Sequence, residues 1–299
     1  LTLPKGTTTD RNRTGGRGLF GGGNTPGTTN TIDFVTIATI GNAQDFGDLT
    51  SARQASGLGS ATRGVFGGTG HPNGNIMDYV TFATTSNAVD FGDLQSSLNG
   101  KASAANSTRG IFSGGGTPTP SNEIDFITIA ALGNATDFGN LTVARRNHAG
   151  VASPTRAVFA GGDAAPTTDT IDYITIATTG NATDFGNLSA ARETAGGASS
   201  STRGVFMGGY TSGDVDVIEY ITIATTGNAT DFGNLSAARR NGCGVSNNIR
   251  GLYAGGFPAV NTIEFVTIAS TGDATDFGDL LTGRLIGTNG ASDSHGGLS

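Results

Sequence analysis

The sequence predicts an all-β fold, a six-bladed β-propeller of four-stranded antiparallel blades, and three observations lead to that prediction. The dipeptide Asp-Phe recurs six times in the 299 residues, at intervals of 45 or 47. Arg followed by a small residue and an apolar pair also recurs six times, at intervals of 46 or 47. The 50 glycines and the 14% of charged residues suit short strands joined by tight turns. A period in the forties without helical apolar spacing is typical of propellers.

The first two strands of a unit are clearest in the copy that starts at Gly150. Its sequence AGVASPTRAVFAGG predicts two short strands around a turn at Ser153 to Arg156. The second strand ends at the Gly-Gly doublet of Gly161 and Gly162, and a loop follows. Because Gly-Gly doublets commonly end strands, this doublet marks the end of the first hairpin.

The next part of the same copy, TIDYITIATTGNATDFGNL, predicts a second hairpin. A third strand over Ile171–Ala177 leads to a turn through Gly180 and Asn181, and a last strand carries Phe185 and Leu188. Large side chains occupy both faces of the third strand, so both faces need cover. Radially arranged sheets provide that cover, because each blade is buried between two neighbours.

The two ends of the chain predict how the ring closes. The first complete strand, GLFGGG from Gly18, matches the second strand of a unit, whereas RLIGTNGAS from Arg284 matches a first strand. We therefore expect the C-terminal strand to complete the N-terminal blade, which removes both sheet edges. The expected organisation is an N-terminal segment over 1–16 and a single propeller over 17–299.

The repeat resembles kelch repeats, in which a Gly-Gly doublet closes the second strand, Tyr lies in the third, a bulky aromatic in the fourth, and Arg follows. Gly161 and Gly162, Tyr173, Phe185 and Arg192 hold these places here, and most other copies have counterparts. The resemblance covers nearly the whole chain. It departs from the kelch pattern in the fourth strand, where this protein has Phe and no Trp.

Comparison of the six copies separates recurring framework from candidate site. Fifteen of the 24 acidic residues occupy recurring positions, and six of these precede the aromatic residue of the third strand. We expect these six to pair with recurring arginines, because a carboxylate and a guanidinium form strong hydrogen bonds. The alternative is a metal or catalytic ring of six carboxylates. The arginines are Arg53, Arg145, Arg192, Arg239 and Arg284.

The loop between the second and third strands varies most, so one face of the propeller is expected to be diversified. Two aromatic residues without a framework position, Tyr210 and Phe257, begin this loop in two copies. Residues after the recurring arginines, Gln54, Arg146, Glu193 and Arg240, should rim the same face. Freely drifting solvated loops are the alternative interpretation. The candidate ligand-binding residues are Tyr210, Phe257, His71, Asn73, Asp163, Asp214, Asp216, Arg146 and Arg240.

Several chemistries find no support in the sequence. A net charge of −7 argues against nucleic acid as a partner, and the apolar runs are too short to span a bilayer. The lone Cys243 excludes an internal disulfide, and the three His lie in separate units without metal-ligand spacing. No nucleophile or phosphate-loop motif is present. We therefore expect no catalytic residues, no metal and no cofactor.

The opening segment LTLPKGTTTDR, Leu1 to Arg11, resembles a short segment common in bacteriophage tail-fibre and virion structural proteins. In those proteins LPKGTT is followed by Arg-Pro, whereas Asn12 follows Arg11 here. The wording TIATTGNATDFG also resembles glycine-rich propeller repeats of marine phages.

These resemblances imply a noncatalytic module of the virion or tail fibre, made in the host cytoplasm. It would recognise a bacterial surface glycan or protein and contact other virion proteins. Two alternatives stay open: a structural decoration or spacer domain, and a propeller glycoside hydrolase.

Overall fold

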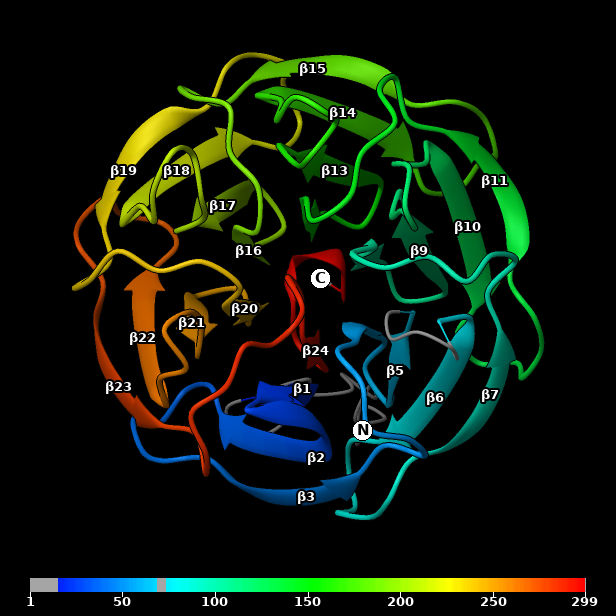
Figure 1. Cartoon of the computed structure of the whole chain (residues 1–299), viewed down its shortest axis with the longest axis vertical. Helices are drawn as coiled ribbons and strands as arrows, with labels where there is room; N and C mark the ends of the chain where they lie inside the picture. The colour runs from blue at the N-terminus through cyan, green and yellow to red at the C-terminus, as the bar shows by residue number, and fades with distance from the viewer. Residues whose placement is uncertain (1–15, 69–73, 299) are drawn as a thin grey trace, which may run out of the picture.

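The protein is a closed ring of six four-stranded antiparallel sheets, here called blades 1 to 6 in chain order (Figure 1). The computed structural model describes residues 16–68 and 74–298. The predicted fold class and blade number are confirmed. Within the described residues no helix has the length and hydropathy to cross a bilayer.

Blades 2 to 6 each consist of four consecutive strands, and Figure 1 shows the first strand nearest the axis and the fourth at the circumference. In blades 2 and 3 the strands are β4 (Ser56–Gly59), β5 (Arg63–Gly67), β6 (Ile76–Thr81), β7 (Val89–Asp93), β8 (Ala102–Ala105), β9 (Arg109–Ser113), β10 (Glu123–Thr128) and β11 (Thr136–Asn140). In blades 4 to 6 they are β12 (Ala149–Ala152), β13 (Arg156–Ala160), β14 (Thr170–Thr175), β15 (Thr183–Asn187), β16 (Gly196–Ser199), β17 (Arg203–Met207), β18 (Val217–Thr222), β19 (Thr230–Asn234), β20 (Cys243–Ser246), β21 (Arg250–Ala254), β22 (Thr262–Thr267) and β23 (Thr275–Asp279).

Blade 1 joins the two ends of the chain, as predicted. The short strand β24 (Ala291–Ser292) pairs with β1 (Arg17–Thr25), and β2 (Gly27–Thr36) and β3 (Gln44–Asp48) follow outward. In blade 1 the variable loop expected between the second and third strands, which would begin at Asn24, is replaced by a continuation of both strands that turns at Pro26. Threonine favours strands and Pro-Gly favours a tight turn, so local chemistry extends this hairpin.

The hydrophobic core lies in the seams between blades, as the two-faced third strand predicted. Ile171 and Phe185 of blade 4 share a buried cluster with Phe206 of blade 5. Ile174 and Ile176 belong to the cluster between blades 4 and 3. Equivalent clusters fill the other four seams. Each blade therefore depends on both neighbours for its core.

The arginine that opens each second strand ties its own blade to the next. In blade 4, Arg156 stacks over Tyr173, with its guanidinium carbon 4.5 Å from the ring centroid. Its Nη1 donates to the Ile223 carbonyl of blade 5 at 3.0 Å. Tyr173 meets Phe185 edge to face at 5.9 Å, a favourable arrangement of two rings. The same stacking is made by Arg17 on Phe34, Arg63 on Tyr79, Arg109 on Phe126, Arg203 on Tyr220 and Arg250 on Phe265.

The near-identical turn between the third and fourth strands covers an exposed sheet edge. The Asn181 Oδ1 of blade 4 accepts the Asn140 N–H of blade 3 at 3.0 Å, and the Gly180 N–H donates to the Phe138 carbonyl at 2.8 Å. The turn thus satisfies backbone groups of the outermost strand next door. The equivalent acceptors are Asn42, Asn87, Asn134, Asn228 and Asp273.

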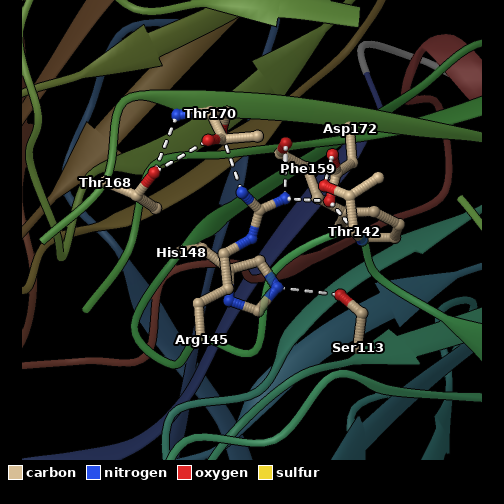
Figure 2. Close-up of polar contacts among 8 residues, drawn as sticks. All are labelled: Ser113, Thr142, Arg145, His148, Phe159, Thr168, Thr170 and Asp172. Carbon is tan, nitrogen blue, oxygen red and sulfur yellow. Dashed lines mark hydrogen bonds and ion pairs between the residues drawn. The ribbon is translucent and has the colours of Figure 1, made fainter. Parts of the chain in front are cut away.

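The predicted pairing of strand acids with recurring arginines is confirmed for five of the six acids, which leaves these carboxylates engaged in the framework. Figure 2 shows the pair in blade 4, where the Arg145 Nη2 lies 2.9 Å from the Asp172 carboxylate and both side chains are fully buried. Arg145 also donates to the carbonyls of Thr170 and Phe159, and Thr142 donates its hydroxyl to Asp172 (Figure 2). The other pairs are Arg53 with Asp78, Arg192 with Glu219, Arg239 with Glu264 and Arg284 with Asp33.

Blade 3 makes this pairing differently. Leu98 occupies the position of the arginine, seven residues after the fourth-strand Phe. The buried Lys101, three residues later, places its ammonium 3.3 Å from Asp125 and 2.7 Å from Glu123. A cation from a neighbouring position therefore serves the same buried acid.

The C-terminal segment closes the central channel, which the sequence did not predict. Figure 1 shows this end of the chain at the middle of the ring. The Thr288 carbonyl accepts the N–H groups of Gly197 and Gly244 at 3.4 and 3.2 Å. The Asn289 side chain bonds the N–H and the carbonyl of Gly150, in the blade opposite blade 1, at 3.2 and 2.8 Å. Residues from one blade thus hold inner strands across the axis.

Glycine is required on these inner strands by close backbone approach. A Cβ on Gly150 would lie 2.3 Å from the Ser103 carbonyl oxygen, and one on Gly244 would lie 2.1 Å from that of Gly197. Below this level the buried 3₁₀ turn Gly296–Leu298 continues the closure. Backbone of the C-terminal segment therefore closes the axis at the level of the inner strands.

Candidate functional site

The variable loops and the connections that follow the fourth strands form one continuous face. Arg146 and Asp163 exchange two backbone hydrogen bonds at 3.0 and 2.8 Å, and Glu193 and Tyr210 do so at 3.0 and 2.9 Å. The Phe257 N–H donates to the Arg240 carbonyl at 2.7 Å. The residues after the recurring arginines therefore rim the variable-loop face, as predicted.

On this face the Arg240 side chain lies between two aromatic rings. Its guanidinium carbon is 4.6 Å from the Tyr210 centroid and 4.4 Å from the Phe257 centroid. Its Nη1 lies 2.9 Å from the Asp214 carboxylate. Phe257 is 42% exposed and is the one aromatic among the exposed large apolar side chains of the described residues. We call Tyr210, Asp214, Arg240 and Phe257 the aromatic clamp.

The aromatic clamp brings together four candidates that are distant in the sequence. Tyr210 and Asp214 come from the loop of blade 5, Phe257 from the loop of blade 6, and Arg240 from the connection between them. Stacking and ion pairing fix the guanidinium plane. The arrangement presents an apolar ring face next to oriented donors, a combination suited to shallow recognition of polar ligands.

The remaining candidates lie elsewhere or outside the described residues. Arg146 pairs with Asp163 at 2.9 Å, in the equivalent place between blades 3 and 4. Asp216 directly precedes β18, and its backbone carbonyl accepts the Leu235 N–H at 2.8 Å. His71 and Asn73 fall in 69–73, outside the described residues.

Four backbone hydrogen bonds run most of the way around the axis on the same face, and we call them the collar. The Asn147 N–H donates to the Gly100 carbonyl, Thr194 to Asn147, Asn241 to Thr194, and Ile286 to Asn241, at 2.6 to 3.1 Å. Asn147, Thr194 and Asn241 have φ of 56°, 59° and 55°. Left-handed backbone is tolerated by Asn but is unusual for β-branched Thr. The collar therefore holds at least one strained residue in place.

Inside the collar lies a cavity of ≈ 180 Å³ that is lined mainly by residues with polar side chains, and we call it the axial cavity. Sequence reasoning missed it because its walls come from several blades, and no single repeat contains a recognisable motif. The only sequence signal is an Asn that recurs two residues after the framework arginine in blades 4 and 6. Side chains that line the cavity include Thr28, Gln54, Asn99, Asn147, Asn241 and Thr288.

The structure also brings a Ser and a His together, without the exposure that catalysis requires. The Ser113 Oγ lies 2.9 Å from the His148 Nε2, and both residues are fully buried (Figure 2). Burial, with smaller contributions from the charges of Arg145 and Lys101, lowers the pKa of His148 well below its usual value. In this structure the pair joins blades 3 and 4 and is closed to substrate. Among the described residues no group of three or more His, Cys, Asp or Glu side chains is placed to hold a metal ion.

No protein-family model matches the sequence, and no curated protein matches it significantly. The six-bladed architecture is thus observed directly, whereas the kelch and phage similarities remain resemblances of sequence wording. The fold itself is consistent with a protein that binds glycans or other proteins.

Proposed function

We propose that this chain is a noncatalytic recognition module of a phage particle, which binds a bacterial surface glycan or protein through its variable-loop face. The observation that carries the proposal is the aromatic clamp. Four residues left over from the repeated framework converge there, with Arg240 held between Tyr210 and Phe257. Residues with no framework position thus form an ordered patch, with Phe257 exposed and the other three half-buried.

The chemistry of the aromatic clamp favours a glycan over a charged polymer. The Arg240 charge is already balanced by Asp214, and the chain has a net charge of −7. An exposed ring such as Phe257 stacks well against the apolar face of a sugar, while nearby donors orient hydroxyl groups. A protein receptor is the second form of this proposal.

The virion assignment depends on sequence alone. It is supported by the resemblance of the opening segment, which lies outside the described residues, and by the wording TIATTGNATDFG. The partners would then be other virion proteins and the host surface, and the location would be the phage particle. Mass spectrometry of purified particles tests this assignment independently of binding.

Glycan-array and host-cell binding of the purified protein test recognition. We expect Phe257→Ala and Tyr210→Ala each to weaken binding at least tenfold, a loss of about 1.4 kcal/mol. Ile249→Ala is the matched control, because Ile249 is 65% exposed and lies in the turn between β20 and β21, at the opposite end of those strands from Phe257. Binding that is unchanged in both aromatic variants would refute the role of the aromatic clamp. A stable complex with virion proteins, with no binding to cells, would instead favour a structural spacer.

A further inference from the structure

We propose that the axial cavity binds one neutral sugar residue, the end of a glycan whose preceding part lies on the aromatic clamp. This inference rests on the proposed function, because it names the ligand class of the same face. It assigns a role to residues that the repeat comparison left without one.

The size of the axial cavity fits one monosaccharide. At ≈ 180 Å³ it is far above the roughly 15 Å³ that a single water needs, so it can admit a ring of monosaccharide size. Thr288 lines the cavity, and the next residue, Asn289, bonds across the axis to Gly150 below it. The C-terminal segment therefore gives the cavity a floor, and a ligand enters it from the variable-loop face.

The polar groups of the axial cavity have hydrogen-bonding capacity that the fold does not use. Among the described residues, the half-buried side chains of Gln54 and Asn241 have no hydrogen-bond partner. The Asn147 amide donates once, to the Glu193 carboxylate at 3.0 Å. Each amide offers two donor hydrogens and an acceptor oxygen, which match the hydroxyl groups of a sugar.

The charges around the axial cavity favour a neutral ligand. Lys101 is the one cationic residue among those that line the cavity, but its ammonium is buried and contacts both Glu123 and Asp125. The Glu193 carboxylate adds a further negative charge beside Asn147. An acidic sugar or a phosphate would enter a negative environment without a free cation. Amides and threonine hydroxyls suit a neutral polyol.

The collar holds the walls of the cavity in advance of binding. Thr194 keeps a left-handed backbone at φ 59°, a conformation that is costly for a β-branched residue and is often found at functional sites. Its neighbours Asn147 and Asn241, which line the cavity, take the same conformation and are bonded to it on either side. Less ordering is then required when a ligand binds.

The axial cavity and the aromatic clamp are adjacent through the chain itself. Arg240 belongs to the aromatic clamp, and the next residue, Asn241, lines the cavity. A glycan that stacks on Phe257 can therefore continue inward with its terminal residue in the cavity. Two contiguous subsites on one ligand raise affinity more than either alone.

Titration calorimetry and saturation-transfer NMR with free sugars test the proposal. The probes are glucose, galactose, mannose and N-acetylglucosamine, with glucuronic acid and inorganic phosphate as charged comparators. We expect at least one neutral sugar to bind the unaltered protein and the two charged probes to bind at least tenfold more weakly. No binding of any neutral sugar, a cavity filled by water only, or preferred binding of the charged probes would overturn the proposal.

Two variants locate the binding. Asn241→Gly removes the amide but keeps the positive φ at no steric cost, and Gln54→Ala removes the second unpartnered amide. Both should weaken binding of the free sugar at least tenfold, whereas the control Gln44→Ala, at the circumference on β3, should not. Wild-type sugar affinity in both variants would refute the cavity assignment.

The same variants separate this proposal from the proposed function. If Phe257→Ala abolishes cell binding while Asn241→Gly leaves both cell and sugar binding intact, the aromatic clamp stands and the axial cavity does not. If neither substitution changes cell binding but Asn241→Gly abolishes sugar binding, the cavity is a sugar site, but the proposed recognition role of the clamp and the continuity of one glycan over both subsites are wrong.

Discussion

Blades 3 and 4 neutralise an equivalent buried aspartate with different residues. Each has a fully buried aspartate at the same place in its third strand, Asp125 in β10 and Asp172 in β14. Blade 4 neutralises it with Arg145 at 2.9 Å, whereas blade 3 has Leu98 at that position and uses Lys101 at 3.3 Å. The fold therefore requires a cation within reach of the acid, and the position that supplies it is free to change.

The exchange has a second consequence, because the lysine position of blade 3 is His148 in blade 4. His148 packs edge to face on Phe159 at 5.9 Å and bonds Ser113 of blade 3. With Arg145 already present, a neutral side chain is preferred there. One position thus carries a charged group in one blade and a neutral imidazole in the next.

The largest expected effect comes from removing the cation of blade 4. Arg145→Met should lower the free energy of unfolding by about 3–5 kcal/mol, because Asp172 becomes a buried charge without its partner. Chemical denaturation followed by circular dichroism measures the change. The adjacent Arg146→Met is the control: its pair with Asp163 is partly exposed, so a loss of at most about 1 kcal/mol is expected. Equal losses in the two variants would contradict the importance of burial.

The next prediction concerns blade 3, where an arginine is placed at the position that Arg145 has in blade 4. Lys101→Ala should cost about 3 kcal/mol in the free energy of unfolding, since Asp125 loses its cation. Adding Leu98→Arg should recover more than half of that loss, because an arginine at this position reaches the acid in five other blades. If the double variant is no more stable than Lys101→Ala, an arginine at position 98 does not neutralise Asp125, and the prediction is wrong.

The sequence predicts the structural features that recur in every copy, but it does not predict contacts made by a residue that differs in a single blade. Six copies of two markers were enough for the fold class and the blade number, and the recurring strand acids and arginines were enough for the five buried pairs. The Lys101 pair was missed because it depends on how far a side chain reaches. In blade 6 another contact also depends on how far a side chain reaches. The Tyr253 hydroxyl accepts the Gly242 N–H at 3.1 Å, and the Tyr253 side chain occupies the space that a side chain at 242 would need.

The candidate site divides in the same way. Tyr210 and Phe257 were identifiable because they stand outside the repeat, and the structure places both against Arg240. The axial cavity was not identifiable, because its polar walls come from residues that are unremarkable within each copy. A site on a symmetry axis exists only after the ring closes, so one unit of sequence contains no sign of it.

The smallest expected effect distinguishes the two blades by pH. Burial lowers the pKa of His148. As the pH falls through about 6.5, the unfolded chain therefore binds a proton at His148, whereas the folded protein does not. His148 therefore contributes stability above pH 6.5 that is lost as the pH falls, by up to about 1.4 kcal/mol per pH unit. Burial raises the pKa of Asp125 to about 6, despite the opposing charge of Lys101 and with a further increase from Glu123. The folded protein then holds a proton between about pH 4 and 6 that the unfolded chain has released, so this contribution favours folding at the lower pH.

Unfolding free energies at pH 7.5, 6.5 and 5.5 separate these opposite contributions. His148→Gln should lose less stability on acidification than the unaltered protein, and Asp125→Asn should lose more. Using differences between variants cancels other groups, such as Asp33, whose pKa burial also raises. If the two substitutions change the pH dependence of the unfolding free energy in the same direction, the predicted opposite contributions of His148 and Asp125 are wrong. Blades 3 and 4 would then differ only in the position of the cation.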